Sequence, residues 1–174
     1  MTHGGAVGVS KFHRRYVKML AMDIEKNLAE MGWVLPTPGK PVGSYVPAVV
    51  IGNLMFISGQ LPMREGKLLA EGKVPSEVPL EAAQKAAAQC AVNALAIAGA
   101  ELGGRWDRIV RVVRIGVFVQ CEAGFGDQAK VANGASDLLK GVMGEAGRHA
   151  RAAVGANALP LNAAVEVEFL FEIR

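Results

Sequence analysis

The sequence predicts an α+β fold in which a β-sheet is covered on one face by two long helices. Two β-rich runs, Tyr45 to Ile51 and Leu54 to Ser58, are joined by a Gly-Asn pair, which is typical of a tight hairpin. Two helical patterns at residues 80–102 and 127–143 alternate with strand patterns at residues 109–119, 150–155 and 165–173. This order, without internal repeats, predicts one mixed domain.

The N-terminal part of the chain divides into a tail and a short helix. With 174 residues, the chain is long enough for one domain with a sizeable core. We expect residues 1–20 to form a disordered basic tail and residues 21–174 to form the domain, with its core in 43–174. Ile24 and Leu28 recur at helical spacing, which predicts a short helix over residues 22–32, followed by a proline-rich linker.

The charge distribution argues against nucleic-acid binding. The net charge is +3, but four basic residues lie in a tail that has no acid, namely Lys11, Arg14, Arg15 and Lys18. Without them, the rest of the chain has 15 basic and 16 acidic groups. A nearly neutral domain lacks the basic surface that is typical of nucleic-acid binding. The tail has no continuous apolar segment, so no secretory signal is expected, and no apolar run approaches the roughly 18 residues that a membrane span needs. With Cys90 and Cys121 in no CxxC pair, a reducing, cytoplasmic location is expected.

Two helices and one central strand dominate the middle of the chain. The first helix is rich in alanine, which allows close packing on a sheet, and Gly103-Gly104 ends it; the preceding residues 59–78 are expected to be irregular. On the strand, one face is predicted to carry Ile109, Val113, Ile115, Val117 and Val119, and the other Val110, Val112 and Phe118. A strand that is apolar on both faces needs cover on both. Because both helices are expected on one side, the other side is predicted to meet another subunit.

The C-terminal strands carry the most informative polar residues. Arg151 lies on the strand at 150–155, and Glu166 lies on the strand at 165–173. The planar fork of an arginine matches the two oxygens of a carboxylate, and a carboxylate on a neighbouring strand can hold a water or transfer a proton. From these residues alone, the favoured interpretation of Arg151 is a salt-bridging arginine at the surface or at a subunit interface. Glu166 can be one of several solvated carboxylates on a sheet face.

The chain resembles the RidA/YjgF family, also called the endoribonuclease L-PSP-like family. The matching segments, in order, are Gly43-Ser44-Tyr45-Val46, Ile57-Ser58-Gly59-Gln60-Leu61-Pro62, Val131-Ala132-Asn133, Ala150-Arg151, Ala158-Leu159-Pro160 and Val165-Glu166-Val167-Glu168. Together they span about residues 43 to 173. The N-terminal extension is similar to that of a distinct, uncharacterised branch of the family.

The resemblance implies a fold and an activity. The fold is YjgF/chorismate-mutase-like, with a mixed, mostly antiparallel six-stranded sheet backed by two long helices. Three subunits are expected to form a homotrimeric barrel with ligand clefts between them. The implied activity is hydrolysis of reactive enamines and imines, such as 2-aminoacrylate, to 2-keto acids and ammonia, without a metal or organic cofactor.

The resemblance also implies roles for particular residues. Arg151 would hold the substrate carboxylate, and Glu166 would lie near the attacking water. Tyr45, Ser58 and Asn133 would line the cleft, with Tyr45 and Ser58 supplied by the other subunit. The family's frequent cysteine two positions after the arginine is replaced here by Ala153. The resemblance therefore does not indicate which substrate this protein prefers.

Simpler interpretations remain for several residues. Tyr45 can be an ordinary strand aromatic, and Ser58 can cap a chain end, because no G-x-S-x-G elbow surrounds it. Asn133 can have a purely structural hydrogen bond. His149 precedes Arg151 by two residues and is expected on the same strand face, where a structural role is favoured. No His or Cys pair has metal-ligand spacing. The alternative functions are binding of a keto acid without turnover and, with less support, ribonuclease activity.

Overall fold

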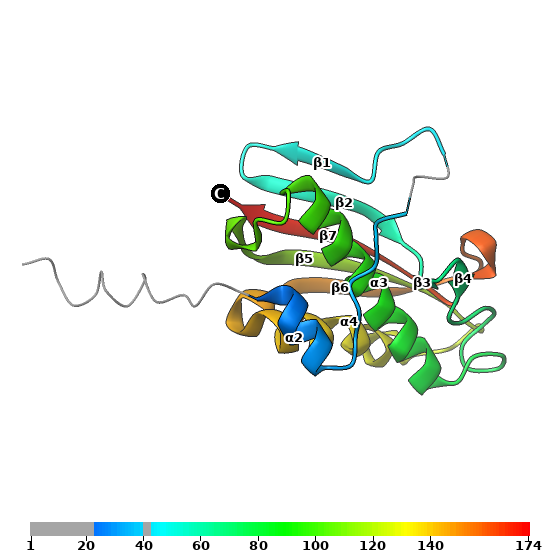
Figure 1. Ribbon diagram of the computed structural model, residues 1–174. Coiled ribbons are helices and arrows are strands. Elements are labelled where there is room, and N and C mark those ends of the chain that lie inside the picture. Colours follow the sequence, from blue (N-terminus) through cyan, green and yellow to red (C-terminus); the bar gives the residue numbers. More distant parts are fainter. Residues whose placement is uncertain (1–22, 40–42) are drawn as a thin grey trace, which may run out of the picture.

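The computed structural model describes residues 23–39 and 43–174 of the chain, so the expected tail at residues 1–20 lies outside the described residues. The helices are α2 (Ile24–Glu30), α3 (Leu80–Glu101) and α4 (Gln128–Met143), with short 3-10 turns η1 (Trp106–Arg108), η2 (Gly144–Gly147) and η3 (Pro160–Asn162). The strands are β1 (Ala48–Ile51), β2 (Leu54–Gln60), β3 (Met63–Arg64), β4 (Lys67–Leu68), β5 (Ile109–Gln120), β6 (Ala150–Ala156) and β7 (Val165–Ile173). The predicted α+β class is confirmed (Figure 1).

The main sheet has five strands in the order β1-β2-β7-β5-β6, rather than the six expected. The remaining two strands, β3 and β4, form a separate small hairpin within residues 59–78, which were expected to be irregular. All pairings in the main sheet are antiparallel except β5 with β6. The β1–β2 hairpin turns at Gly52, whose φ of 60° is readily adopted by glycine.

The position of β7 corrects one expectation. The strand that carries Glu166 is not the neighbour of the strand that carries Arg151, because β5 lies between β7 and β6. The chain leaves β5, passes through α4 and returns as β6, and this crossover gives the parallel pair. It then passes β5 and enters the sheet between β2 and β5 as β7.

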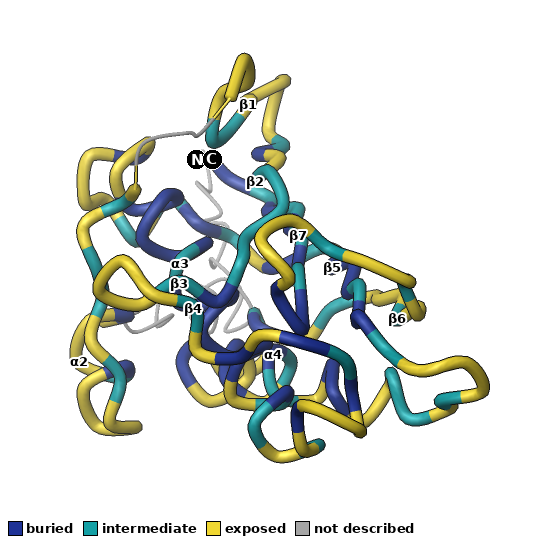
Figure 2. The backbone as a smooth tube through the Cα atoms, turned by 90° about the vertical axis from the view of Figure 1, so that its right-hand side faces the viewer, coloured by how far each residue is buried: buried dark blue, intermediate teal, exposed yellow. Residues whose placement is uncertain are grey.

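Both long helices cover the same face of the sheet, as predicted, and the core lies between them and the strands (Figures 1 and 2). The alanines of α3 are almost all buried there. Helices α3 and α4 approach very closely at Gly134, where a Cβ would overlap the backbone carbonyl of Gln84. Helix α2 packs beside α4 through buried Ile24 and Leu28, and Asn27 donates a hydrogen bond to the Val142 carbonyl at 2.7 Å.

The faces of β5 differ from the expected strict alternation. The buried positions are Ile109, Val112, Ile115, Val117 and Val119, whereas Val113 is only partly buried. Two register shifts against β7, between residues 109 and 111 and between residues 112 and 114, cause the difference. Each bulge inserts one residue and so exchanges the two faces of the strand.

Candidate functional site

Arg151 lies on β6 at the edge of the sheet, and its side chain extends over the helix-covered face toward α4. Its strand partner is Ile115, a fully buried residue, which identifies this face. Nη1 donates to Ser136 Oγ at 3.0 Å, and Nη2 donates to the Ala129 carbonyl at 3.1 Å. A guanidinium has five N–H donors, so three have no acceptor in the described part of the chain. Arg151 is exposed and therefore presents an anchored cation to an approaching anion.

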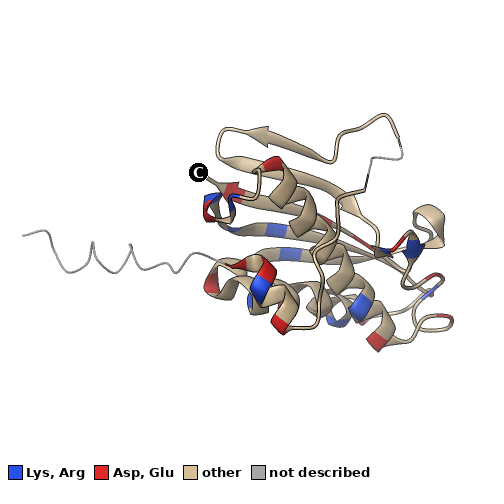
Figure 3. Ribbon diagram, viewed as in Figure 1, with Lys and Arg blue, Asp and Glu red and all other residues tan. Residues whose placement is uncertain are grey.

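Two other predicted residues lie close to Arg151. Asn133 is an exposed residue of α4 between Ala129 and Ser136, and spacings of four and three residues place all three on one side of the helix. Ala153 follows Arg151 on the same face of β6 and packs against the core. Figure 3 shows basic residues on the neighbouring strands β5 and β6. Arg151, Asn133 and Ala153 therefore lie together where β6 meets α4.

His149 lies on the same face as Arg151, as predicted, and contacts the same serine. Its Nε2 lies 3.0 Å from Ser136 Oγ, and its Nδ1 lies 2.6 Å from the Gly147 carbonyl oxygen. Burial lowers the pKa of His149, and the Arg151 charge lowers it further, against the opposing effect of the Gly147 hydrogen bond. The imidazole is therefore favoured in its neutral form.

Glu166 lies on the opposite face of the sheet, which none of the described helices covers. Its cross-strand partner on β5 is Phe118, which in turn pairs with Val154 of β6. The carboxylate lies against Gly59 of β2, where any Cβ would overlap Oε1. Burial raises the pKa of Glu166, and the charge of Glu168 raises it further. A carboxyl group of this kind exchanges protons closer to neutral pH than an ordinary glutamate does.

The next carboxylate along the strand has a different environment. Glu168 Oε1 accepts a hydrogen bond from Arg114 Nη1 at 3.0 Å, and both side chains are about half exposed. Like Glu166, it lies over a glycine, because a Cβ at Gly116 would overlap its side chain. Of the two carboxylates, only Glu166 lacks a basic partner within the described residues.

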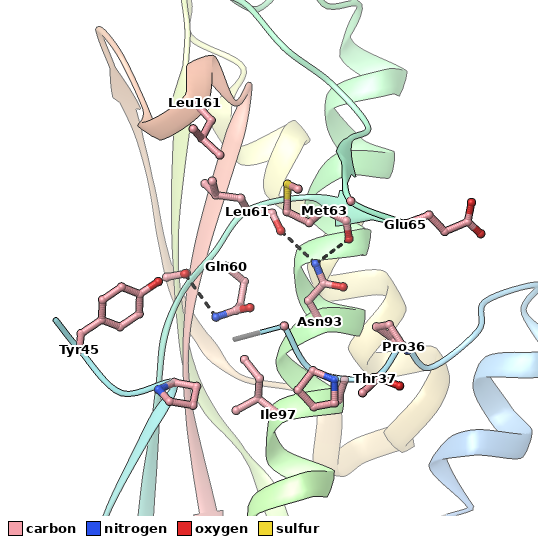
Figure 4. Close-up of a pocket in the computed structure, with 16 residues that line it drawn as sticks. Pro36, Thr37, Tyr45, Gln60, Leu61, Met63, Glu65, Asn93, Ile97 and Leu161 are labelled. Carbon is pink, nitrogen blue, oxygen red and sulfur yellow. Dashed lines mark hydrogen bonds between the residues drawn. The ribbon is translucent and has the colours of Figure 1, made fainter. Parts of the chain in front are cut away.

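Ser58 and Tyr45 lie near Gly59, the residue that the Glu166 carboxylate contacts. Ser58 Oγ donates to the Val46 carbonyl at 2.7 Å, so its hydroxyl ties β2 to the segment that precedes β1. Tyr45 is exposed and lines a cavity of about 350 Å³ together with Gly59 and Gln60. Figure 4 shows this cavity between the Tyr45 segment, the end of β2 and helix α3, with the Glu65 carboxylate pointing away from it.

The cavity is bounded on its other side by the N-terminal linker. Residues Pro36 to Gly39 lie near Ile97 of α3 and contribute one wall (Figure 4). Asn93 of α3 donates to the carbonyls of Leu61 and Met63 at 3.0 Å each, which fixes the chain after β2 (Figure 4). The linker therefore shapes a wall next to Tyr45.

The single chain does not bring the predicted residues into one site. Arg151 and Glu166 are separated by β5 and lie on opposite faces of the sheet. The two strand spacings between β6 and β7 alone separate their backbones by about 10 Å. The chain therefore presents two half-sites, one around Arg151 and one around Glu166, Ser58 and Tyr45.

The uncovered sheet face carries many apolar side chains. Val49 of β1 and Phe56 of β2 pair with each other and are 46% and 45% exposed, and Val154 of β6 is 48% exposed. Among residues 23–39 and 43–174, no group of three or more His, Cys, Asp or Glu residues is placed to hold a metal ion. None of the described helices is both long enough and apolar enough to cross a membrane.

Sequence reasoning missed the two partners of Arg151 on α4 and the role of Gly59. Ala129 and Ser136 lie seven residues apart, on either side of Asn133, so helical periodicity alone would place them on one stripe. The contact between Gly59 and Glu166 depends on the pairing of β2 with β7, which no local pattern indicates.

Residues 25–173 match the family described as YjgF/chorismate mutase-like, putative endoribonuclease. The chain belongs to this family. A YjgF-family fold of helices over a mostly antiparallel sheet agrees with the architecture above. Protein TCP17 of Trypanosoma cruzi is 41% identical over 152 residues, which cover 87% of this chain and 94% of TCP17.

Two solved structures are similar to this chain. The protein Atu1372 of Agrobacterium tumefaciens, whose function is unknown, is 44% identical with a TM-score of 0.84, covering 93% of this chain and 99% of that one. RidA from an Antarctic Psychrobacter species is 30% identical with a TM-score of 0.52, covering 79% and 94%. The match to Atu1372 thus extends over more of this YjgF-family chain.

Proposed function

We propose that the protein hydrolyses reactive enamines and imines that bear a carboxylate, such as 2-aminoacrylate, to a 2-keto acid and ammonia. The observation that carries the proposal is the anchored, exposed guanidinium of Arg151. Three of its N–H donors have no hydrogen-bond acceptor among the described residues. A guanidinium fixed in this way can bind a carboxylate in a bidentate manner without first losing side-chain freedom.

The proposed enzyme is a homotrimer in which each active site is shared by two subunits. The split between the Arg151 half-site and the Glu166 half-site supports this, because a second copy of the chain can supply the missing half. The exposed apolar side chains Val49, Phe56 and Val154 also support it, since such a face is more stable when a neighbouring subunit covers it. Tyr45 and Ser58 would then line the cleft from the subunit that supplies Glu166.

The proposed chemistry needs only a positioned water and a proton-transfer group. An enamine takes up a proton at carbon to become an iminium, water adds to the C=N carbon, and ammonia leaves from the resulting carbinolamine. An iminium is already electrophilic, so positioning and proton transfer can supply the catalysis. Glu166, with its raised pKa, would take a proton from the water and return it to the departing nitrogen.

The direct test is an assay on purified protein with 2-iminopropionate generated in place by an amino-acid oxidase. Semicarbazide competes with hydrolysis for the imine, so catalysis appears as a lower yield of semicarbazone. We expect acceleration by the wild type, and none by Arg151→Ala at equal concentration. If the folded, assembled wild-type protein gives no acceleration over buffer, the proposal is wrong.

A matched arginine provides the control. Arg148 lies three residues before Arg151, is exposed, and pairs with Glu145 at 3.3 Å on η2. Because exposed pairs of this kind contribute little to stability, Arg148→Ala is expected to keep both activity and assembly. Light scattering on all three proteins separates a loss of chemistry from a loss of the trimer.

Binding without turnover is the second candidate, and one observation favours it. Within one chain, the Arg151 half-site has an anion receptor but no carboxylate among its hydrogen-bond partners, so it can bind a keto acid by itself. Thermal stabilisation by pyruvate that is lost in Arg151→Ala, together with no imine hydrolysis, would favour this function. RNA cleavage that is lost in the same variant would instead favour the ribonuclease.

A further inference from the structure

The Arg151 side chain belongs to a hydrogen-bonded chain of three residues that ends in a backbone carbonyl. Arg151 Nη1 and His149 Nε2 both lie 3.0 Å from one atom, Ser136 Oγ. His149 Nδ1 lies 2.6 Å from the Gly147 carbonyl oxygen. Helix α4, turn η2 and strand β6 are thus connected at the residue proposed to hold the substrate.

For a neutral imidazole, the chemistry of these groups fixes the direction of each hydrogen bond. A carbonyl oxygen only accepts, so His149 Nδ1 carries the proton that is donated to Gly147. In the neutral imidazole, Nε2 is then an acceptor, and it receives the hydroxyl proton of Ser136. The remaining lone pairs of Ser136 Oγ are turned toward Arg151, whose Nη1 can only donate.

The charges around His149 are compatible with this arrangement. Arg151 is the charged residue whose field acts on the imidazole, and it opposes protonation. On η2, Glu145 pairs with Arg148, and from β5 the Arg111 side chain donates to the Arg148 carbonyl at 3.4 Å. On α4, Asp137 and Lys140 are exposed. A neutral His149 can therefore hold the serine without placing a second positive charge beside Arg151.

We infer that His149 and Ser136 are positioning residues for Arg151: the neutral imidazole orients the Ser136 hydroxyl, and the hydroxyl holds the guanidinium against α4. The value of this positioning rests on the carboxylate-binding role proposed above for Arg151. With the guanidinium held in this way, its other three N–H donors have no acceptor among the described residues and are available to a ligand. Without His149 and Ser136, the Ala129 carbonyl would be the remaining anchor. Each binding event would then have to immobilise the guanidinium, which weakens binding.

The test measures pyruvate affinity by calorimetry and imine hydrolysis by the competition assay. Ser136→Ala and His149→Leu are each expected to weaken pyruvate binding about tenfold, in the range of hydrogen bonds to charged groups. The KM should rise by a similar factor while kcat stays within about twofold, since Arg151 binds the carboxylate equally in the ground and transition states. Ser136→Thr and His149→Gln, which each keep a polar atom at the same place, should recover part of the affinity.

Two measurements distinguish positioning from a general structural role. Asp137→Ala, at the exposed position beside Ser136 on α4, should bind pyruvate as the wild type does. Nitrogen-15 NMR of the imidazole should show the proton of His149 on Nδ1. A proton on Nε2, or loss of affinity that Ser136→Thr and His149→Gln do not restore, would overturn the inference.

The inference and the proposed function fail separately. Pyruvate binding that is lost in Arg151→Ala but unchanged in Ser136→Ala and His149→Leu overturns the positioning role alone. Pyruvate binding that survives Arg151→Ala overturns the carboxylate-binding role, and with it the purpose assigned to the pair.

Discussion

The carboxylate of Glu166 rests directly on the backbone of Gly59, and no other amino acid at position 59 leaves it this room. Gly59 lies in β2 and Glu166 in the adjacent strand β7, next to a register shift between Ile57 and Gln60. The irregular pairing and the absence of a side chain together create the space that the carboxylate occupies. Partial burial in this space raises the pKa of Glu166.

This relationship predicts the effect of Gly59→Ala. The added Cβ would push the Glu166 carboxylate out of its place, and a displacement of about 1 Å can lower a rate about 100-fold. We expect imine hydrolysis to fall by this order while the protein stays folded. Gly126→Ala, at a glycine with no heavy atom near the added Cβ, should retain full activity.

Glu166→Gln should remove one limb of the pH–rate profile. If Glu166 acts as a base, kcat/KM falls as the pH drops through its pKa, which lies above the ordinary value of 4.5. The glutamine variant should lose this limb and about 100-fold or more in rate. An unchanged acidic limb in the variant would assign the titration to another group.

The same substitution has a predicted effect on stability. The pKa of Glu166 is raised in the folded protein, so ionisation opposes folding at pH values above that pKa. Glu166→Gln should therefore increase the free energy of unfolding at neutral pH. The gain should shrink as the pH falls and vanish below the pKa of the unfolded chain. Urea denaturation at pH 7.5 and pH 4 measures the difference.

His149 should make the folded protein less stable in mild acid. Its pKa is lowered from 6.5 on folding, so the unfolded chain binds a proton more readily in the window just below that value. The stabilisation is present above pH 6.5 and is lost as the pH falls through the lower, folded-state pKa. Thermal melting of wild type and His149→Gln from pH 7.5 to 5 should show a steeper decline for the wild type.

Gly134→Ala tests the contact between the two long helices. A Cβ at this position would overlap the Gln84 carbonyl on α3, and backbone cannot move aside as a flexible side chain can. Overpacking of this kind costs about 1–3 kcal/mol. We expect a lower denaturation midpoint, with Gly126→Ala as the neutral comparison. Equal stability of the two variants would contradict the close approach of α3 and α4.

Much of the fold could be predicted because its signals are local. The Gly-Asn turn, the alanine-rich pattern of α3 and the alternation of β7 each depend on residues a few positions apart, and each element lies close to its expected range. The half-sites could not be assembled in this way. Which strand lies beside β6, and which faces of β5 are buried, depends on long-range pairing and on two bulges.

The sequence by itself determined that this is a YjgF-family chain with an arginine on one C-terminal strand and a glutamate on the next strand in sequence. Order along the chain and the types of residue carry that information. Only the tertiary structure decided that β5 separates Arg151 from Glu166, that the two side chains occupy opposite faces, and that Ser136 and Ala129 anchor the guanidinium. The physical reason is that strand pairing and crossover connections bring distant segments together, and local side-chain patterns do not encode which segments meet.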